Sequence, residues 1–365
     1  MTTSGQGTRP TTIYSVAQRA GVSIATVSRV LQGKGVTSPQ AQAKVLQAVE
    51  DLEYVPLQSA RGLAVQKSEA HGFVVYDLAG PYYSELLMGY ESAAATFGKS
   101  VIIVVTHGRE DPTRVVRELS SRVDGLVISN STIPDEAART LGRRTPVVLL
   151  ARPTVLGCDS VSAENAQSAR ALTQHLIDHG RRRLFFVGDP DGSPDTQERY
   201  LGFTEALSTS DASAAGPPIR VDFHERSGAQ VAAQVIAHPD GPDALVCAND
   251  ELALSTMKAL QRSGVKVPDD IAIVGWDDVM TARYVSPGLT TVRQPLYELG
   301  RAAATRLHER ITGAPPAPEP RILPTELVLR SSCGCPEKDE LDAPWVASRD
   351  RTIARRQSPT KEDNK

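Results

Sequence analysis

The side chains best suited to a definable chemistry lie near the start of the chain. In the stretch "SIATVSRVLQ", one side carries small, apolar or hydrogen-bonding groups that fit a major groove: Ile24, Ala25, Ser28 and Arg29. Arginine can bind guanine through two hydrogen bonds, and an apolar side chain can contact a thymine methyl group. Other side chains can reach backbone phosphates and set the register: Tyr14, Thr26, Ser28 and Gln32. Ser23, at the start of the stretch, is a further DNA-binding candidate. These residues predict a double-stranded DNA partner.

The charge distribution favours the same partner. The first 49 residues contain five cationic side chains and neither Asp nor Glu, whereas the whole chain has a formal net charge of −3. Residues 1–67 carry a net charge of +4, so the remainder must carry −7. A basic end on an acidic protein indicates that this end meets a polyanion. A solvated basic arm, or a helical bundle that contacts another protein, is the alternative.

Three short helices must position these side chains. The first is predicted from apolar residues at i, i+3, i+4 and i+7: Ile13, Val16, Ala17 and Ala20. Gly21 ends this helix, and Ser23 caps the second one. The third begins at Ser38 and Pro39 and is predicted to bury four apolar side chains: Val45, Leu46, Val49 and Leu52. Three short helices with a tight turn between the first two form a helix-turn-helix unit.

These motifs match a known family. The stretch "IYSVAQRAGVSIATVSRVLQGKGVTSPQAQAKVLQAVEDLEYVP" closely resembles the headpiece of the LacI/GalR transcriptional repressors. The A-x-x-A-G-V-S-x-x-T-V-S-R core, the Y-x-P and the following "SARGLA" match in order and spacing. The resemblance implies that Ile24, Ala25 and Arg29 read bases, and that Leu63 wedges into the minor groove at the operator centre. Three positions depart from the family's usual residue: Ser15, Gln32 and Leu57.

The segment after the headpiece is predicted to be a hinge. Residues 58–65 are too few for a stable isolated helix, since helices under about 12–15 residues are marginal in water. Gly62 disfavours helix by about 1 kcal/mol relative to Ala. We therefore expect the hinge to be disordered in the free protein and helical when two subunits meet on DNA. A plain flexible linker is the alternative.

From His71 onward, short apolar runs alternate with helical segments, among them "GFVVYDL", "DGLVISN", "IRVDF" and "IAIVGWD". This alternation predicts a two-lobed α/β domain of parallel, Rossmann-like sheets after the small all-α domain. The similarity of "VDGLVISN" and "PDALVCAN", 119 residues apart, indicates two similar lobes that face one cleft. The predicted organisation is as follows: a disordered arm, 1–10; a helix-turn-helix domain, 11–57; a hinge, 58–69; lobe 1, 70–161 and 295–320; lobe 2, 162–294 and 321–330; a disordered tail, 331–365.

This domain also resembles the effector domains of the same repressors, which share the fold of periplasmic sugar-binding proteins. Matching segments include "VSAENAQSARALTQHLIDHGRRRLFFVGD" and "CANDELALSTMKALQRSGVKVPDDIAIVGWDD". The resemblance implies contacts to a sugar-like effector from six residues: Tyr82, Tyr83, Arg199, Phe223, Asn249 and Asp277. Trp276 is a further aromatic at the cleft edge, although packing is an equal alternative. Ala151 stands where sugar-responsive relatives often have Asp, and the neighbouring Arg152 is predicted to favour a phosphorylated or acidic ligand.

Several classes of protein are excluded or disfavoured by what the sequence lacks. It contains no phosphate-binding loop, dinucleotide-binding glycine motif or nucleophile elbow, so neither an enzyme nor a cofactor is expected. Four scattered cysteines do not form a disulfide framework, and Cys333-x-Cys335 has no nearby His in the sequence, so no metal is expected. No apolar run is long enough for a membrane span or a signal peptide, which predicts a cytoplasmic location.

The leading interpretation is a dimeric transcriptional repressor that binds a palindromic operator and responds to a sugar-like effector. A dimer is favoured over a tetramer because the tail lacks an apolar heptad repeat. Activation instead of repression, or a response to a non-sugar metabolite, would use the same chemistry. A sugar-binding transport component would share the sheets but would have no use for residues 11–65.

Overall fold

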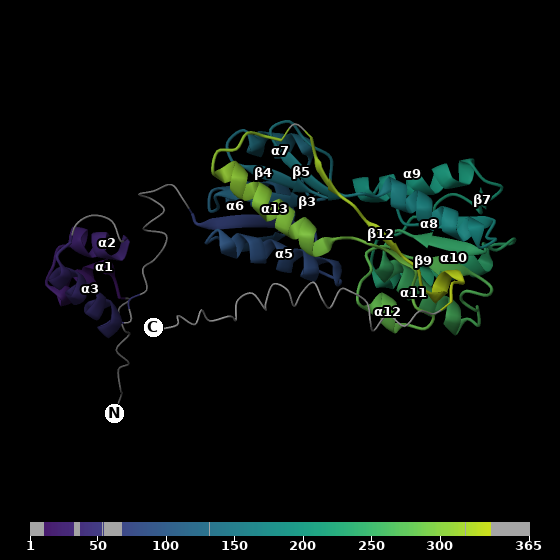
Figure 1. Ribbon diagram of the computed structural model, residues 1–365, viewed down its shortest axis with the longest axis horizontal. Coiled ribbons are helices and arrows are strands. Elements are labelled where there is room, and N and C mark those ends of the chain that lie inside the picture. Colours follow the sequence, from purple (N-terminus) through teal and green to yellow (C-terminus); the bar gives the residue numbers. More distant parts are fainter. Residues whose placement is uncertain are drawn as a thin grey trace, which may run out of the picture. The chain divides into compact units, whose positions relative to one another are not determined.

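A computed structural model describes residues 11–32, 37–52, 54, 68–130, 132–317 and 319–336. The chain divides into two compact units, Met1–Ser68 and Glu69–Lys365. Their secondary structure confirms the predicted fold class, a small helical domain followed by two parallel α/β sheets (Figure 1).

The first unit is a helix-turn-helix of α1 (Ile13–Ala20), α2 (Ile24–Gln32) and α3 (Pro39–Asp51). Gly21 ends α1 in the left-handed conformation at φ 64°, which Gly adopts without steric cost. Ser15, which stands where the family usually has an acid, closes a capping box with Thr12. The core of the unit contains Val16, Val27 and Val45, each fully buried. The prediction that Leu46 is buried was wrong, because this side chain is 51% exposed on the outer side of α3.

The first lobe of the second unit is a six-stranded parallel sheet in the order β11-β5-β4-β3-β1-β2. Its strands are β1 (Ala70–Val75), β2 (Ser100–Val105), β3 (Gly125–Ser129), β4 (Val147–Leu150), β5 (Asp159–Ala163) and β11 (Arg321–Leu323). Its helices are α5 (Tyr82–Thr96), α6 (Pro112–Ser120), α7 (Asp135–Gly142) and α13 (Leu296–Ile311). Side chains alternate along each strand, so Phe73 and Val75 pack with α5 and α13, whereas Val74 packs with α6 and α7.

Helices α5 and α13 pack unusually closely. A Cβ atom on Gly89 would lie 1.9 Å from the carbonyl oxygen of Tyr297, and one on Gly300 would lie 2.0 Å from that of Leu86. Only glycine fits at such a crossing. This contact fixes α13, which the chain reaches after it has built both lobes, firmly in the first lobe.

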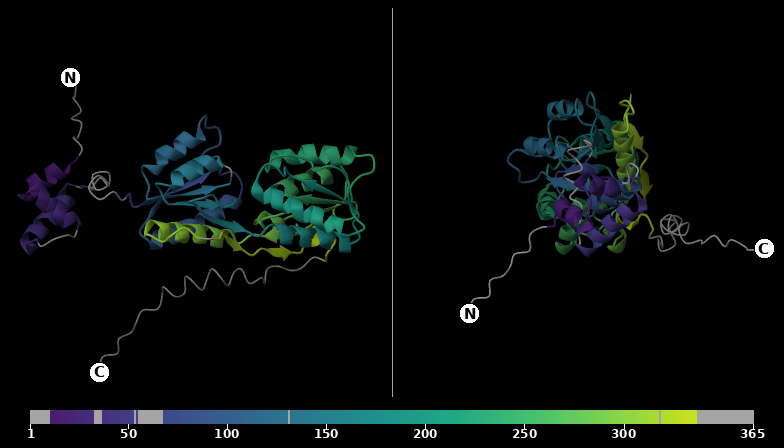
Figure 2. Two further views of the ribbon diagram at one scale, coloured as in Figure 1. Left: turned by 90° about the horizontal axis from the view of Figure 1, so that it is seen from above. Right: turned by 90° about the vertical axis from the view of Figure 1, so that its left-hand side faces the viewer.

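The second lobe is a four-stranded parallel sheet in the order β7-β6-β8-β9. Its strands are β6 (Arg183–Val187), β7 (Ser213–Ala214), β8 (Ala244–Cys247) and β9 (Ala272–Val274). The helices are α8 (Ala166–Asp178), α9 (Pro194–Ser208), α10 (Gly228–Ala237), α11 (Asp250–Arg262) and α12 (Thr281–Tyr284), with a 3₁₀ turn, η1 (Glu225–Ser227). A separate antiparallel pair joins β10 (Thr291–Arg293) to β12 (Glu326–Val328). Figure 2 shows α13 and the strands that follow it running along one side of both lobes.

The two sheets repeat one strand order. In the first lobe β1 lies between β2 and β3, and in the second β6 lies between β7 and β8. The similar segments found in the sequence occupy equivalent strands, β3 and β8, which are each followed by an asparagine near the strand end. The sequence repeat therefore reflects a repeat in topology.

Three sequence predictions need correction. Residues 321–330, which the sequence assigned as a whole to lobe 2, are divided between the lobes, because β11 pairs with β5 whereas β12 pairs with β10. Strand β5 runs to Ala163, beyond the predicted boundary at 161. The expected strand at residues 219–223 is reduced to an isolated bridge between Ile219 and Val187, since the strand pairing with β6 is β7 instead.

The predicted start of the disordered tail was also wrong. A 3₁₀ turn, η2 (Ser331–Cys333), packs in the second lobe with Ser332 and Cys333 fully buried. Ser332 accepts a hydrogen bond from the Thr290 backbone and donates one to the carbonyl oxygen of Ile273, at 2.8 and 2.6 Å. Order thus extends to at least residue 336, and the rest of the predicted tail lies outside the described residues.

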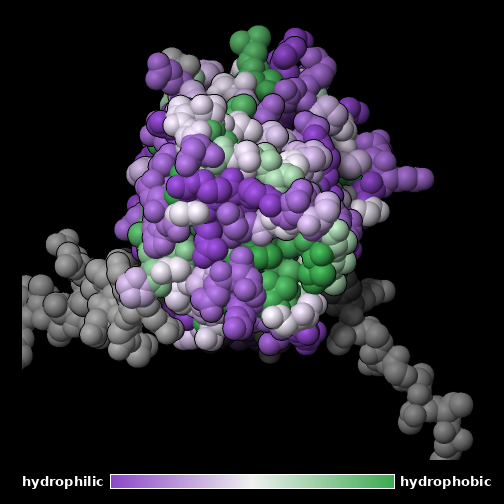
Figure 3. All heavy atoms as spheres, turned by 90° about the vertical axis from the view of Figure 1, so that its right-hand side faces the viewer, coloured by the Kyte–Doolittle hydropathy of each residue, from purple (hydrophilic) through white to green (hydrophobic). Residues whose placement is uncertain are grey.

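The described helices include none that is both long and apolar enough to cross a bilayer. Hydrophilic residues cover most of the end of the second lobe, with hydrophobic residues gathered in one part of it (Figure 3).

Candidate functional site

Helix α2 presents the side chains predicted to contact DNA. Ile24, Ala25 and Arg29 are exposed, Ser28 is half-buried, and Val27 on the opposite side is fully buried. The helix therefore keeps its apolar side for the core and leaves the predicted base-reading side accessible. Of the remaining predictions for this unit, the Gln32 side chain and Leu63 lie outside the described residues.

The start of α2 is held by a hydrogen-bonded cap. The Ser23 hydroxyl accepts from the Thr26 backbone N–H at 3.2 Å and lies 2.9 Å from the Thr26 hydroxyl. Ser23 thus caps α2 as predicted, and Thr26, predicted as a phosphate contact, has a structural role as well. Tyr14 is 68% exposed on α1, and Arg19 on the same helix donates to Asp51 of α3 at 2.7 Å. Arg19 therefore ties the helices together, whereas Arg29 forms no ion pair within the part of the chain that the structure describes.

The second unit contains a cavity of about 590 Å³ between its lobes. Its walls come largely from the segments that follow the carboxyl ends of β1, β3, β6, β8 and β9, where ligands bind in parallel α/β sheets. Six of the eight predicted effector residues line it: Tyr82, Tyr83, Arg199, Phe223, Asn249 and Asp277. The fold thus brings these six side chains, which lie far apart in the sequence, to one cavity.

Carboxylates dominate the polar lining of this cavity. Six acidic side chains contribute: Asp77, Asp189, Asp195, Asp222, Glu251 and Asp277. Two arginines oppose them, Arg199 and Arg220, and the latter pairs with Asp189 and Asp191 at the cavity edge. The lining therefore offers many acceptors and few cationic groups that an anionic ligand could use.

Arg199 is the best-fixed of these side chains. It is 5% exposed, and its guanidinium donates to Asn165 Oδ1 at 2.8 Å and to the carbonyl oxygen of Ala248 at 2.6 Å. Asn165, which begins α8, also donates to Asp195 at 3.2 Å. The guanidinium lies over the ring of Trp276, 4.5 Å from its centroid. Arg199 thus joins the start of α8, the end of β8 and the segment after β9.

Burial changes the proton affinity of the two carboxyl groups near Arg199. It raises the pKa of Asp195 to about 6, although the Arg199 charge and the Asn165 hydrogen bond act in the opposite direction. Burial also raises the pKa of Asp277, again against the Arg199 charge. Asp277 accepts a hydrogen bond from Gln294 at 2.6 Å. A ligand hydroxyl could therefore meet an acceptor or a donor here, depending on pH.

The aromatic and amide residues shape the rest of the cavity. Asn249 caps α11 by accepting from the Leu252 N–H at 3.1 Å, and it donates to the carbonyl oxygen of Phe223 at 3.1 Å. Asn249 therefore holds the Phe223 segment in place. Tyr82 and Tyr83 contact each other edge to face with centroids 5.1 Å apart, and burial raises the pKa of Tyr83 to about 12. Both phenols consequently stay protonated near neutral pH.

Two predicted effector residues lie outside the cavity lining. Arg152 is 5% exposed and donates to the carbonyl oxygens of Asn130 and Ile133, at 2.9 and 3.0 Å, and to the carboxylate of Asp135. Its charge stabilises the loop after β3, so the prediction that it binds an acidic ligand was wrong. Trp276 is 2% exposed and packs in the core, which favours the alternative of packing.

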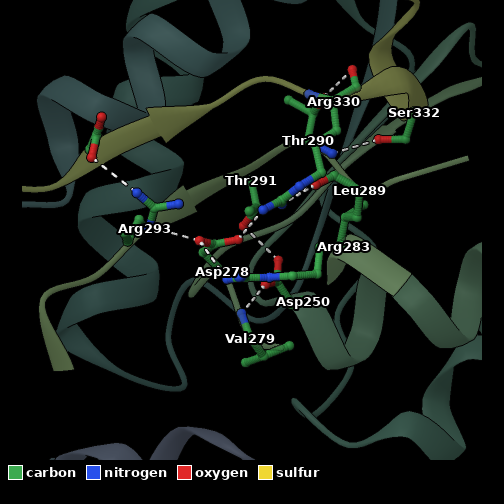
Figure 4. Close-up of polar contacts among 11 residues, drawn as sticks. Asp250, Asp278, Val279, Arg283, Leu289, Thr290, Thr291, Arg293, Arg330 and Ser332 are labelled. Atoms are coloured by element: carbon green, nitrogen blue, oxygen red, sulfur yellow. Dashed lines mark hydrogen bonds and ion pairs between the residues drawn. The ribbon is translucent and has the colours of Figure 1, made fainter. Parts of the chain in front are cut away.

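Behind Asp277 lies a buried polar network, shown in Figure 4. The Asp278 carboxylate binds Arg330 at 2.6 Å and Arg293 at 2.7 Å, and its side chain is 1% exposed. Asp250 accepts from the Thr291 hydroxyl at 2.6 Å and from the backbone N–H of Val279 at 2.9 Å. The network links the cavity wall to β10 and to the segment beyond β12.

Sequence reasoning missed several residues of the cavity. The polar ones include Asp77, Asn130, Thr132, Asp189, Ser193, Asp195, Arg220, Asp222, His224, Glu251 and Gln294. Asp77, Asn130 and Asp189 each follow a strand end by one or two residues, so the strand-end rule could have found them. The others lie on loops or at helix starts, such as Asp195 in α9 and Glu251 in α11, whose position over the cavity the sequence does not reveal.

Comparison with known proteins gives two family matches. Residues 12–57 match the model described as bacterial regulatory proteins, lacI family, and residues 173–333 match the periplasmic binding protein-like domain. The first match coincides with the helix-turn-helix unit. The second starts in α8 and ends at Cys333.

Full-length relatives and solved structures are similar over most of the chain. The ribose operon repressor of Halalkalibacterium halodurans is 32% identical over 332 residues, 90% of this chain and 99% of that protein. The PurR transcriptional repressor of Photobacterium profundum is 32% identical, over 88% of this chain and 98% of its own. The lac repressor dimer bound to operator and the anti-inducer ONPF has a TM-score of 0.77 at 28% identity, covering 89% of this chain and 99% of that one. The CelR–cellobiose complex has a TM-score of 0.67 at 29% identity, covering 89% of this chain and all of that one.

Proposed function

The chain belongs to the lacI family of bacterial regulatory proteins and is a transcriptional repressor of that family, not an enzyme. From this premise we propose that it acts in the cytoplasm as a homodimer on a palindromic operator. We further propose that a neutral, polyhydroxylated effector in the interlobe cavity controls its binding to DNA.

The observation that carries the DNA proposal is the division of α2 into two sides. Val27 is buried against the other helices, while Ile24, Ala25 and Arg29 are exposed in the order that the resemblance assigns to base contacts. The capped start at Ser23 fixes the angle at which this side is presented. Leu63 would then occupy the minor groove at the centre of the site.

The neutral character of the effector rests on the acidic lining. An anionic group would be brought close to several carboxylates, while Arg199 is already bound to Asn165 and Ala248. Hydroxyl groups, by contrast, can donate to Asp195 or Asp277 while a sugar ring packs on Phe223. Two of the similar proteins carry a sugar in their names: the ribose operon repressor and the CelR–cellobiose complex.

The exposed edge of the first sheet supports the homodimer. Ile102 and Ile103 on β2 are 39% and 42% exposed, although parallel strands are normally covered on both faces. A second copy would bury this edge. Effector-driven closure of the lobes would then rotate the paired first lobes and separate the two hinges. Such coupling must be reciprocal, so operator should weaken effector binding by the same factor.

The test is fluorescence anisotropy of the full chain on DNA from upstream of its own gene, with scrambled DNA as the control. A panel of neutral mono- and disaccharides would be compared with the phosphate ester of each sugar. We expect tight, salt-sensitive binding that one neutral sugar changes at least tenfold and its phosphate does not. Release by the phosphate alone would contradict the neutral effector. Equal binding to scrambled DNA would contradict recognition of an operator at this position.

A further inference from the structure

Two histidines and two cysteines meet where the end of the folded chain contacts α8. His175 lies in the last turn of α8 and His179 is its C-cap, so the two are four residues apart on one side of the helix. Cys333 ends η2 and Cys335 follows it. The C-x-C pair, which has no histidine near it in the sequence, therefore has two near it in the fold. The partners lie about 160 positions earlier in the chain, where sequence spacing gives no signal.

The distances between these side chains are those of a metal site. His175 Nε2 lies 3.3 Å from Cys333 Sγ and 3.5 Å from Cys335 Sγ, and His179 Nε2 lies 3.5 Å from Cys335 Sγ. Zinc–sulfur bonds of about 2.3 Å and zinc–nitrogen bonds of about 2.0–2.1 Å at a tetrahedral angle would separate N and S by about 3.6 Å. Three of the four form a compact set, since the ligand atoms of His175, Cys333 and Cys335 all lie within 4.8 Å of one another, and His179 adjoins this set through Cys335.

We propose that His175, His179, Cys333 and Cys335 bind one zinc ion, which fastens the end of the folded chain to α8. Two imidazoles and two thiolates form a complete tetrahedral set, typical of a structural zinc site with no position left for a substrate. No catalytic role is therefore proposed for the ion.

The surroundings hold the ligands as a metal site requires. The Thr290 hydroxyl donates to Cys333 Sγ at 3.1 Å, a contact that would orient and stabilise a thiolate ligand. Ser332 fixes η2 through its bonds to Thr290 and Ile273. Gly334 has φ 105°, which lets the chain turn between the two cysteines, and a Cβ there would lie 3.5 Å from His179 Nδ1. The C-x-C spacing, shorter than is usual in zinc sites, is thus accommodated by this turn.

The proposed site connects to the buried network behind the cavity. The Thr290 hydroxyl oxygen also accepts from the backbone N–H of Arg330 at 2.8 Å, and Arg330 binds Asp278, the neighbour of the cavity residue Asp277. Zinc would therefore stabilise the segment that supports this wall of the cavity. Its binding energy would appear as stability of the second lobe, because an ion that binds only the folded state favours that state.

The test uses the untagged full-length protein, purified under reducing conditions, with its zinc content measured by mass spectrometry after gel filtration. We expect one zinc ion per chain. We also expect Co²⁺, added to metal-free protein, to give the visible absorption of tetrahedral cobalt with a thiolate-to-cobalt charge-transfer band. Zinc should raise the unfolding temperature of the metal-free protein.

Variants separate the proposed site from adventitious binding. Cys335→Ser and His179→Gln change the more accessible ligands, so these proteins should fold, and we expect each to weaken zinc binding at least tenfold. Cys158→Ser, which removes a buried thiol of the first lobe, should retain one zinc ion per chain. No zinc or cobalt bound in the wild type, or stoichiometry unchanged in Cys335→Ser, would show that these groups are merely hydrogen-bonded thiols and imidazoles.

Discussion

The guanidinium of Arg199 lies 4.5 Å from the ring centroid of Trp276, so a positively charged group at the cavity wall packs against an aromatic side chain of the core. Trp276 is 2% exposed, and its indole nitrogen has no hydrogen-bond partner in the described part of the chain. The indole ring therefore contacts Arg199 through its face and not through its N–H group. Arg199 in turn donates to Asn165 and Ala248, which belong to different segments of the second lobe. The pair therefore links the wall of the interlobe cavity to the core that stabilises the second lobe.

Arg199→Lys should destabilise the second lobe by about 1–3 kcal/mol, because lysine keeps the charge but cannot reproduce both buried hydrogen bonds. Urea unfolding would measure the change. Arg170→Lys is the matched control, because this arginine of the same lobe is exposed and pairs with Glu205 at 3.5 Å, so the change should alter stability by less than about 1 kcal/mol. An Arg199→Lys protein as stable as the wild type would mean that the two hydrogen bonds contribute little.

Arg29→Ala should weaken binding to operator by about 1–3 kcal/mol and relax specificity at one base pair. Anisotropy on operator and on scrambled DNA would measure both effects. Arg19→Ala is the control, because Arg19 pairs with Asp51 and should chiefly lower the stability of the helical unit, by no more than about 1 kcal/mol. If Arg29→Ala weakened binding to operator and to scrambled DNA equally, Arg29 would not be one of the residues that read bases.

Local patterns were sufficient to predict the helices, most strands and the repeat of the two lobes. The three helices of the first unit follow from apolar spacing and from caps at Thr12, Ser23 and Ser38, all of which act within four residues. The position of Asn130 and Asn249 after equivalent strands likewise follows from a local similarity. These features depend on neighbours in sequence, and so a single sequence reveals them.

Contacts between distant segments were the main source of error. Arg152 follows a strand end as cavity residues do, yet it turns to the loop after β3, where backbone carbonyls and Asp135 bind its charge. The polar sequence after Arg330 suggested disorder. In the structure, Ser332 donates a hydrogen bond to β9, and Cys333 packs in the core of the second lobe with side chains of α8. Neither outcome could be read from composition, because the partner groups come from elsewhere in the chain.

Asp278→Asn should destabilise the protein by about 3–5 kcal/mol, because it leaves the 5% exposed Arg330 without its closest buried counter-charge. The backbone of Asp278 has φ 56°, which asparagine tolerates, so the loss would reflect the charge and not strain. Glu326→Gln is the control: Glu326 binds Arg293 from a 72% exposed position and should change stability by less than about 1 kcal/mol. Urea unfolding of the two variants gives the comparison. Similar losses in both would contradict the assignment of Asp278 as the centre of the network.

His71 should make stability fall as the pH is lowered from about 6.5 towards 4. Burial, and secondly the nearby Lys99 charge, lower the pKa of His71 to about 4. Between this value and the ordinary pKa near 6.5, the unfolded chain binds a proton that the folded chain does not, so the free energy of unfolding rises with pH across this window. Above it, His71 contributes no slope.

His71→Gln tests this dependence, since glutamine does not titrate and can still meet the Tyr90 hydroxyl that lies 3.2 Å from His71 Nδ1. Other groups, such as Asp195 with its raised pKa, also titrate in this range, so the informative quantity is the difference between variant and wild type. Urea unfolding at a series of pH values should show the wild type losing about 3 kcal/mol more than the variant on going from pH 7 to about pH 4. Parallel curves for the two proteins would mean that His71 is protonated without cost in the folded state, and that water reaches its side chain on β1.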